Sequence, residues 1–226
     1  MSQFEFHQCT SPGCGLRIPL DLDQYSGQFC PRCGAPLEKI IPSLSGDLDE
    51  ASTQPVRRIS TLLDNIRSAH NVGAIFRTAD GAGVKELYLC GFTPTPDDTS
   101  AIAKTALGAE EHVPWTQHRN ALVLADDLRA KGARLIALER LPKATPIYRF
   151  RVEPRDKRPW VLVVGNERAG VDPGLLERCD DVVALPMAGE KTSLNVAVAF
   201  GAAAYWLCFA RSAPPEDRHT KMENKR

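Results

Sequence analysis

Residues 56–211 alternate between short apolar runs and longer stretches in which apolar residues recur on one helical face. The short runs predict strands and the periodic stretches predict helices. We expect strands at Ser60–Ile66, Glu86–Cys90, His112–Trp115, Arg134–Leu138, Trp160–Val164 and Val182–Leu185. We expect helices at Asn71–Ala82, Asp98–Leu107, Arg119–Lys131, Asp172–Arg178 and Ser193–Ala210. Strands separated by helices predict an α/β fold, with a mainly parallel sheet covered by helices on both faces.

The segments that flank this pattern are of a different kind. Residues 1–40 hold four of the seven cysteines and predict a small separate module. Residues 41–55 are rich in Ser, Asp and Pro, and we interpret them as a linker. Residues 212–226 are polar and contain two consecutive prolines, so we expect a flexible tail.

The four cysteines of the first module have the spacing of a zinc site. Cys9 and Cys14 form one pair, Cys30 and Cys33 form the other, and each pair ends in Cys-Gly. Glycine allows the tight turn in which backbone amides face thiolate sulfur, and two such turns build a four-thiolate zinc site. Two disulfides are the alternative, but nothing in the sequence indicates export. A closed four-cysteine site is structural, so we assign no catalysis to it.

Composition and charge narrow the function classes. Hydrophobic residues make up 43% and charged residues 25%, which is typical of a globular protein. No apolar run reaches the roughly 18 residues of a membrane span, and the N-terminus resembles no signal peptide. We therefore expect a cytoplasmic protein with no membrane partner. The net charge of zero does not favour RNA binding, although residues 143–158 hold six basic and two acidic side chains. That segment is either a solvated loop or a phosphate-contacting patch.

Polar and glycine residues at the ends of the predicted strands indicate a binding site. Gly165 directly follows Trp160–Val164, Met187 follows the next strand, and Ser193 opens the last predicted helix. Glycine allows close approach of a ligand to the backbone, and a helix start offers free amides. Such a pocket suits an adenine ring and a thioether better than a triphosphate, because few basic residues line it. Each residue also has a structural interpretation, such as Asn71 as a helix N-cap or Arg77 as a surface ion-pair partner.

Several common motifs are absent from the sequence. Residues 165–170 do not have the G-x-G-x-x-G pattern of a dinucleotide site, and residues 189–192 do not form a phosphate loop. The chain also lacks the G-x-S-x-G elbow of serine hydrolases.

Three segments closely resemble the SpoU (TrmH-like) family of SPOUT RNA methyltransferases. They are LDNIRSAHNVGAIFRTADGAGV at 63–84, VVGNERAGVDP at 163–173 and LPMAGEKTSLNVAVA at 185–199. The resemblance spans roughly residues 56–211, and the four-cysteine module is an addition to it. It implies a SPOUT-type α/β domain with a C-terminal trefoil knot, bound S-adenosylmethionine, and methyl transfer to a ribose 2′-hydroxyl of tRNA or rRNA. It also implies a homodimer.

The resemblance assigns roles to individual residues. The expected catalytic residues are Asn71, Arg77, Glu167, Ser193 and Asn195. The expected cofactor-binding residues are Leu138, Glu139, Gly165, Asn166, Glu167, Leu185, Met187, Ser193 and Leu194. Arg77 would act as base or as positioning group. A knotted RNA-binding protein without activity and a base methyltransferase of the same fold are the alternatives.

Overall fold

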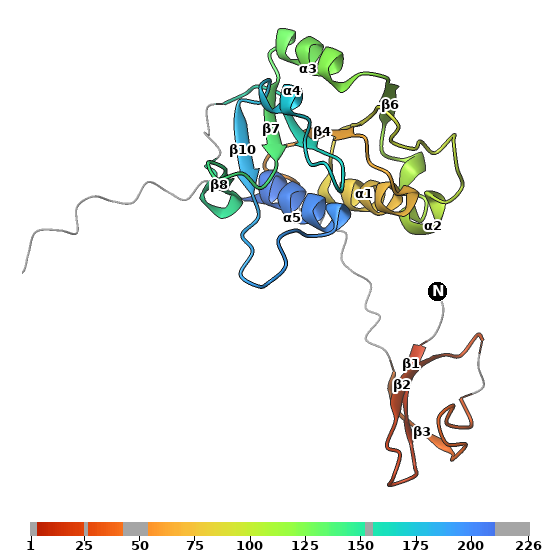
Figure 1. Cartoon of the computed structure of the whole chain (residues 1–226). Helices are drawn as coiled ribbons and strands as arrows, with labels where there is room; N and C mark the ends of the chain where they lie inside the picture. The colour runs from red at the N-terminus through yellow and green to blue at the C-terminus, as the bar shows by residue number, and fades with distance from the viewer. Residues whose placement is uncertain (1–3, 25–26, 43–53, 152–155, 211–226) are drawn as a thin grey trace, which may run out of the picture. The chain divides into compact units, whose positions relative to one another are not determined.

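The computed structural model describes residues 4–24, 27–42, 54–151 and 156–210. The chain divides into two compact units, residues 1–52 and residues 53–226 (Figure 1). Most of the predicted linker and all of the predicted tail lie outside the described residues.

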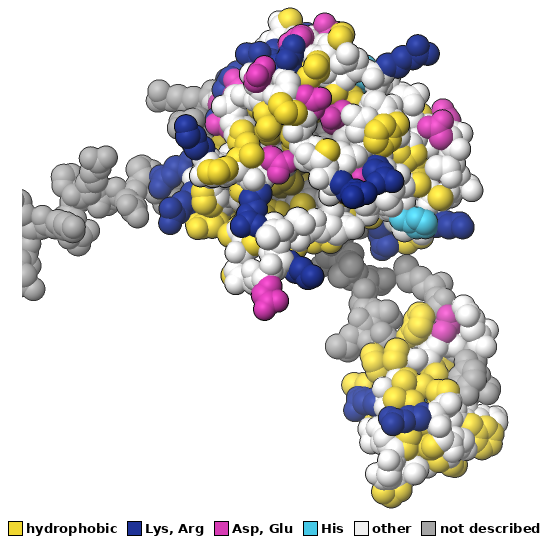
Figure 2. Space-filling view, viewed as in Figure 1, with side chains coloured by type: hydrophobic (Ala, Val, Ile, Leu, Met, Phe, Trp, Pro, Cys, Tyr) yellow, Lys and Arg dark blue, Asp and Glu magenta, His cyan; other side chains and the backbone are white. Residues whose placement is uncertain are grey.

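The small unit is a three-stranded antiparallel sheet with the order β2-β1-β3. Its strands are β1 (Phe4–Cys9), β2 (Arg17–Asp21) and β3 (Leu37–Pro42). Because β3 continues to Pro42, the linker cannot begin at residue 41 as predicted. Phe4, Ile40 and Ile41 are each about half exposed, and hydrophobic side chains gather on the visible face of this unit (Figure 2).

The large unit contains a seven-stranded sheet in which every strand pair is parallel. The order is β6-β5-β4-β9-β7-β10-β8. The strands are β4 (Ile59–Asp64), β5 (Leu87–Cys90), β6 (Trp115–His118), β7 (Arg134–Leu138), β8 (Thr145–Pro146), β9 (Trp160–Val164) and β10 (Asp181–Ala184). The predicted parallel α/β fold is therefore confirmed.

Helices cover both faces of this sheet, as predicted (Figure 1). One face packs on α1 (Ala69–Ala82) and α5 (Val196–Phe209), and the other packs on α3 (Ala121–Ala130) and α4 (Pro173–Leu176). Strand β9 is buried along its whole length and supplies alternate residues to both cores. This central position explains why its sequence, WVLVV, is apolar throughout.

Two predicted elements between β5 and α3 are wrong in extent. The helix expected at Asp98–Leu107 is reduced to α2 (Ala103–Ala106), and Leu107 and Gly108 both have positive φ angles that end it. The strand expected at His112–Trp115 begins only at Trp115, because the short 3₁₀ helix η1 (Ala109–Glu111) and its following turn occupy the residues before it. Strand β8 and the 3₁₀ helix η2 (Ile147–Arg149) were not predicted.

No helix among the described residues is long and apolar enough to cross a membrane.

Candidate functional site

A cavity of about 280 Å³ opens at the carboxyl ends of β7, β9 and β10. In an open parallel sheet, this edge is where ligands bind. Its walls include all nine residues expected to bind the cofactor, which are Leu138, Glu139, Gly165, Asn166, Glu167, Leu185, Met187, Ser193 and Leu194. Val164, Val196 and Ala199 add apolar surface, and Arg140 and Arg168 add positive charge.

A tight loop after β9 shapes one wall of the cavity. Asn166 and Gly170 exchange backbone hydrogen bonds, and the Asn166 side-chain oxygen accepts from two further amides inside the loop. A Cβ atom on Gly165 would lie 2.3 Å from the Gly170 carbonyl oxygen, so only glycine fits there. The Glu139 carboxylate accepts a hydrogen bond from the amide of Val171 at 2.8 Å. Glu139 therefore fixes this loop as well as lining the cavity.

The Glu167 carboxylate is held at the start of α1. It accepts hydrogen bonds from the backbone amides of Arg67 and Ser68, at 2.9 Å and 3.2 Å, and from the Asn71 side-chain amide at 3.1 Å. Partial burial alone would raise the pKa of Glu167, but these donors outweigh it and lower the pKa below its usual value. Glu167 is therefore ionised, and its carboxylate oxygens accept hydrogen bonds from groups of the protein itself.

Asn71 joins Glu167 to the start of α5. Its side-chain oxygen accepts a hydrogen bond from the Asn195 side-chain amide at 3.0 Å. The Asn195 oxygen in turn accepts from the amides of Ala197 and Val198, so Asn195 is the N-cap of α5. Residues from three distant segments thus form one hydrogen-bonded chain beside the cavity.

Two of these placements correct the sequence analysis. The N-cap of α1 is Ser68, whose hydroxyl accepts from the Asn71 amide at 3.3 Å, so Asn71 is free to bind Glu167 and Asn195. Helix α5 begins at Val196 rather than at Ser193, because the Asn195 side chain caps it. Ser193 lies in the preceding segment, exposed at the wall of the cavity.

Arg77 is not brought to the cavity of its own chain. It lies on α1, but six residues of helix turn it about 120° away from Asn71. It is exposed, and it has no hydrogen-bond or ion-pair partner among the described residues. Of the five expected catalytic residues, the structure gathers Asn71, Glu167, Ser193 and Asn195.

A second, more open hollow adjoins the cavity. Its lining residues are Arg67, Ser68, Asn71, Glu167 and Arg168, so Glu167 and Arg168 line both spaces. In the wall of the main cavity, Arg140 donates to the Thr192 carbonyl at 2.8 Å and ties the end of β7 to the segment before α5.

Sequence reasoning missed Ser68, the amides of Arg67 and Ser68, and the Arg140 bridge. Ser68 had a detectable signal, since a serine just before a periodic apolar stretch is typical of an N-cap. The two amides and the hydrogen bond from Arg140 to Thr192 had no such signal, because any residue type can supply a backbone amide or carbonyl.

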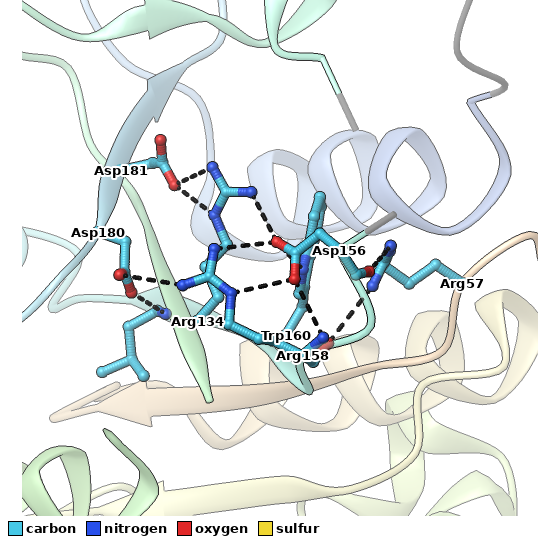
Figure 3. A network of polar contacts seen from close by, with 8 residues as sticks. Arg57, Arg134, Asp156, Arg158, Trp160, Asp180 and Asp181 are labelled. Carbon is cyan, nitrogen blue, oxygen red and sulfur yellow. Dashed lines mark hydrogen bonds and ion pairs between the residues drawn. The ribbon is translucent and has the colours of Figure 1, made fainter. Parts of the chain in front are cut away.

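The basic segment 143–158 is not one continuous patch among the described residues. Asp156 bonds to Arg134 and Arg158 at 3.0 Å, and Arg158 also pairs with Asp180 (Figure 3). Arg57 and Arg134 stack on the Trp160 ring at 4.2 Å and 5.1 Å. These residues lie at the amino ends of β4, β7, β9 and β10, opposite the cavity. Arg155 lies outside the described residues.

The four cysteines of the small unit come together as the spacing predicts. Their sulfur atoms all lie within 4.8 Å of one another, and all seven cysteines of the chain are free thiols. Gly15 and Gly34, which follow Cys14 and Cys33, both have positive φ angles. The backbone amides of Arg32 and Cys33 hydrogen-bond to the Cys30 sulfur. His7 is buried in the same unit and bonds to Glu5.

The chain resembles several proteins of known family. A putative TrmH family tRNA/rRNA methyltransferase, YacO of Bacillus subtilis, is 32% identical over 70% of this chain and 59% of its own length. The 23S rRNA (guanosine-2′-O-)-methyltransferase RlmB of Vibrio cholerae is 33% identical over 69% of this chain and 60% of its own. The chain thus spans less than two thirds of the length of these relatives.

Solved structures show the same fold. The TrmH/SpoU tRNA modifying enzyme of A. aeolicus superposes with a TM-score of 0.59 at 27% identity, covering 68% of this chain and 75% of the other. An AdoMet-bound rRNA methyltransferase from Sinorhizobium meliloti gives a TM-score of 0.61 at 25% identity, covering 77% of this chain and 64% of the other. The model of the SpoU rRNA Methylase family matches residues 58–205. With most of its larger unit covered by that match, the chain belongs to the SpoU rRNA Methylase family.

Proposed function

We propose that the protein is an S-adenosylmethionine-dependent RNA methyltransferase that modifies a ribose 2′-hydroxyl of tRNA or rRNA. The observation that supports this best is the hydrogen-bonded chain Glu167–Asn71–Asn195 beside a cavity at the carboxyl edge of the sheet. Family membership and the names of the relatives support the same reaction class.

The cavity has the chemistry that S-adenosylmethionine requires. Leu138, Leu185, Met187 and Leu194 offer apolar walls for an adenine ring, and the glycine at 165 leaves backbone within reach of a ligand. The carboxylates of Glu139 and Glu167 favour a positive charge nearby. When bound, the cofactor supplies an activated methyl group on a sulfonium, which needs little further activation.

The protein's task is then to position and deprotonate a weakly acidic hydroxyl. Glu167 orders the start of α1, and Asn71 and Asn195 hold the starts of α1 and α5 together. These residues fix the walls between the cavity and the open hollow, where an acceptor ribose fits. Ser193 contributes a hydroxyl to the same wall.

Arg77 acts in this proposal through a second copy of the chain. It lies on α1, which packs against α5; Val198 and Tyr205 on α5, with Leu194 just before this helix, form an exposed apolar stripe. Exposed fractions of 43–58% for such side chains favour a protein partner. We propose a homodimer through this face, with Arg77 serving the joint site, and a trefoil knot in the segment after β9.

We also propose that the four cysteines bind one structural zinc ion. Ligand sulfurs about 2.3 Å from zinc in a tetrahedron stand about 3.8 Å apart. The Cys14 and Cys30 sulfurs are 3.8 Å apart, and those of Cys9 and Cys33 are 3.4 Å apart. The fit supports a closed site that stabilises a unit too small to fold on its own core.

The function is tested with the full chain. Calorimetry with S-adenosylhomocysteine measures cofactor binding, and tritiated methyl incorporation into tRNA and rRNA measures transfer. Nuclease-resistant dinucleotides after digestion identify ribose methylation. Modified bases in place of those dinucleotides would indicate a base methyltransferase, and binding without transfer would indicate a knotted RNA-binding protein.

Substitution Arg77→Ala tests the catalytic assignment. We expect methyl transfer to fall about a hundredfold, the usual cost of removing one charged group that stabilises a transition state. Binding of S-adenosylhomocysteine and the melting temperature should stay unchanged, because Arg77 is exposed and its guanidinium has no hydrogen-bond or ion-pair partner among the described residues. Near-normal turnover by this variant would remove Arg77 from the mechanism.

Substitution Val198→Glu tests the dimer. A charge in the centre of the α5 stripe should shift the protein to monomers in sedimentation velocity and reduce methyl transfer with it. Val123→Glu is the matched control, because Val123 on α3 is also 58% exposed and lies on the opposite face of the sheet. A wild-type protein that sediments as a monomer would contradict the proposed interface.

A further inference from the structure

The open hollow next to the cavity is bordered by two arginines whose guanidinium groups are unused. Arg67 and Arg168 are both exposed and both line the hollow. Only their backbone amides form hydrogen bonds, so neither guanidinium has a partner among the described residues. In contrast, Arg57, Arg134, Arg140, Arg158 and Arg178 all bind acceptors within the protein.

The amides of Arg67, Ser68 and Asn71, three residues that line this hollow, are already hydrogen-bonded within the protein. The amides of Arg67 and Ser68 already bind Glu167, and the amide of Asn71 binds the Ser68 hydroxyl. The side-chain groups of Asn71 are also occupied, by Glu167 and Asn195. Among the residues that line the hollow, the guanidinium groups of Arg67 and Arg168 are therefore the cationic donors left to bind an anion.

The nearby carboxylate forms no ion pair with either guanidinium group. Glu167 lines the same hollow, but its oxygens accept hydrogen bonds from backbone amides and from the Asn71 side chain instead. Two free guanidinium groups suit phosphate, which arginine binds in a bidentate manner. On the visible face of the large unit, basic side chains are scattered among acidic ones (Figure 2). An anion would therefore be attracted by the two neighbouring guanidinium groups rather than by a broad positively charged surface.

We propose that Arg67 and Arg168 bind backbone phosphates of the RNA on either side of the acceptor ribose, and so place its 2′-hydroxyl at the mouth of the cofactor cavity. This inference rests on the proposed function, because it takes the occupant of the hollow to be the RNA substrate. Arg168 lines both spaces and Arg67 lines only the hollow, which places the two contacts on different sides of the acceptor.

The test measures the affinity of the full chain for a mixed-sequence single-stranded RNA oligonucleotide over a salt series. Arg67→Gln and Arg168→Gln should each weaken binding several-fold at low salt. Each should also make the slope of log affinity against log salt shallower by about 0.7, the value for one lost phosphate contact on a single strand. Arg129→Gln on α3 is the control, because it removes the same charge from an exposed position far from the hollow.

Two results would overturn the inference. Slopes that match those of Arg129→Gln would show that the two arginines contact no phosphate. Loss of S-adenosylhomocysteine affinity in Arg168→Gln with an unchanged salt slope would assign that residue to the cofactor instead. Unaltered melting temperatures exclude misfolding as a cause.

The outcomes separate this inference from the proposed function. If the wild-type protein transfers methyl groups to RNA and the slopes do not change, the inference fails and the function stands. If the slopes change as expected but no methyl transfer to any RNA is detected, the phosphate contacts stand and the enzyme assignment fails.

Discussion

Glu167 carries its charge without pairing with a cation. Its carboxylate accepts from two backbone amides and the Asn71 side chain, which together lower its pKa. The carboxylate therefore stays ionised above the usual glutamate pKa of about 4.3, and its hydrogen bonds weaken only as the pH falls through the lower folded-state value.

Glu167→Gln should reduce methyl transfer about tenfold or more while the chain remains folded. Glutamine keeps the shape of the side chain, but its amide group would face the donors of Arg67, Ser68 and Asn71, and a hydrogen bond to a charged group is worth about 1.5–3 kcal/mol. Steady-state kinetics together with a thermal melt measures both effects. Full activity in this variant would mean that order at the start of α1 does not limit the reaction.

Gly165→Ala should weaken S-adenosylhomocysteine binding strongly. The new Cβ would lie 2.3 Å from the Gly170 carbonyl oxygen, so the loop that forms the cavity wall must move. Gly189→Ala is the matched control, because a Cβ there meets nothing within 4 Å. Calorimetry on both variants gives the comparison, and equal affinities would contradict a role for the Gly165 loop in the cavity.

For individual residues, the sequence analysis predicted the lining of the cavity well but did not predict the contacts between the functional side chains. Gly165, Leu185 and Met187 were predictable because strand ends and glycine restrict where a parallel sheet can bind. For Asn71 the resemblance implied a catalytic role and local sequence an N-cap, but neither predicted its bonds to Glu167 and Asn195, which lie 96 and 124 positions away. The position of Arg77 outside the cavity depends on the rotation of α1 against the sheet, which residue types do not encode.

At the level of whole elements, ion pairs and hydrogen bonds connect the amino ends of the central strands. Arg134, Trp160 and Asp181 open β7, β9 and β10, and Asp156 and Arg158 bridge them (Figure 3). Hydrogen bonds from Arg158, and then from Arg134, hold the pKa of Asp156 well below its usual range despite burial. A lowered carboxylate pKa stabilises the fold above the unfolded pKa, and the contribution is lost as the pH falls.

Asp156→Asn should lower the free energy of unfolding by about 2–3 kcal/mol at neutral pH, the range for lost hydrogen bonds to a charged group. The difference from wild type should shrink as the pH falls below about 4, because the carboxylate of the unfolded wild-type chain then takes up a proton, which favours unfolding. Urea unfolding at several pH values measures this. A difference that stays constant down to pH 2 would exclude the charge of Asp156 as its source.

The predicted helix and strand bounds were wrong where tertiary contacts determine the extent of an element. Residues 98–107 were predicted as one helix, but only Ala103–Ala106 are helical, and the backbone of Leu107 ends them in a left-handed conformation. Strand β6 is placed by its register with β5, which pairs Leu87 with Trp115 and Cys90 with His118. A sequence window contains neither constraint, whereas β7 and β9 are apolar enough to be recognised alone.

On the scale of the whole molecule, the described part of the small unit has no excess of positive charge. The described part of the small unit holds three basic residues, Arg17, Arg32 and Lys39, against four acidic ones, Glu5, Asp21, Asp23 and Glu38. Four thiolates around a divalent ion would add further negative charge. RNA affinity should therefore come from the large unit.

Removal of zinc should unfold the small unit and leave the cofactor site intact. Cys30→Ser or a strong chelator should make residues 1–42 sensitive to protease, while calorimetry with S-adenosylhomocysteine gives the wild-type affinity. Metal analysis of the wild type should find one zinc per chain. A metal-free protein whose small unit resists protease would refute the structural role of the metal.

The ionic ties among Arg134, Asp156 and Asp181 lie at the edge of the sheet opposite the cavity. Strand order is thus secured where no ligand enters, and residues 188–191, which lie between the cavity-lining Met187 and Thr192, contribute little to it. Substitutions at these four positions can therefore alter substrate preference without loss of thermal resistance.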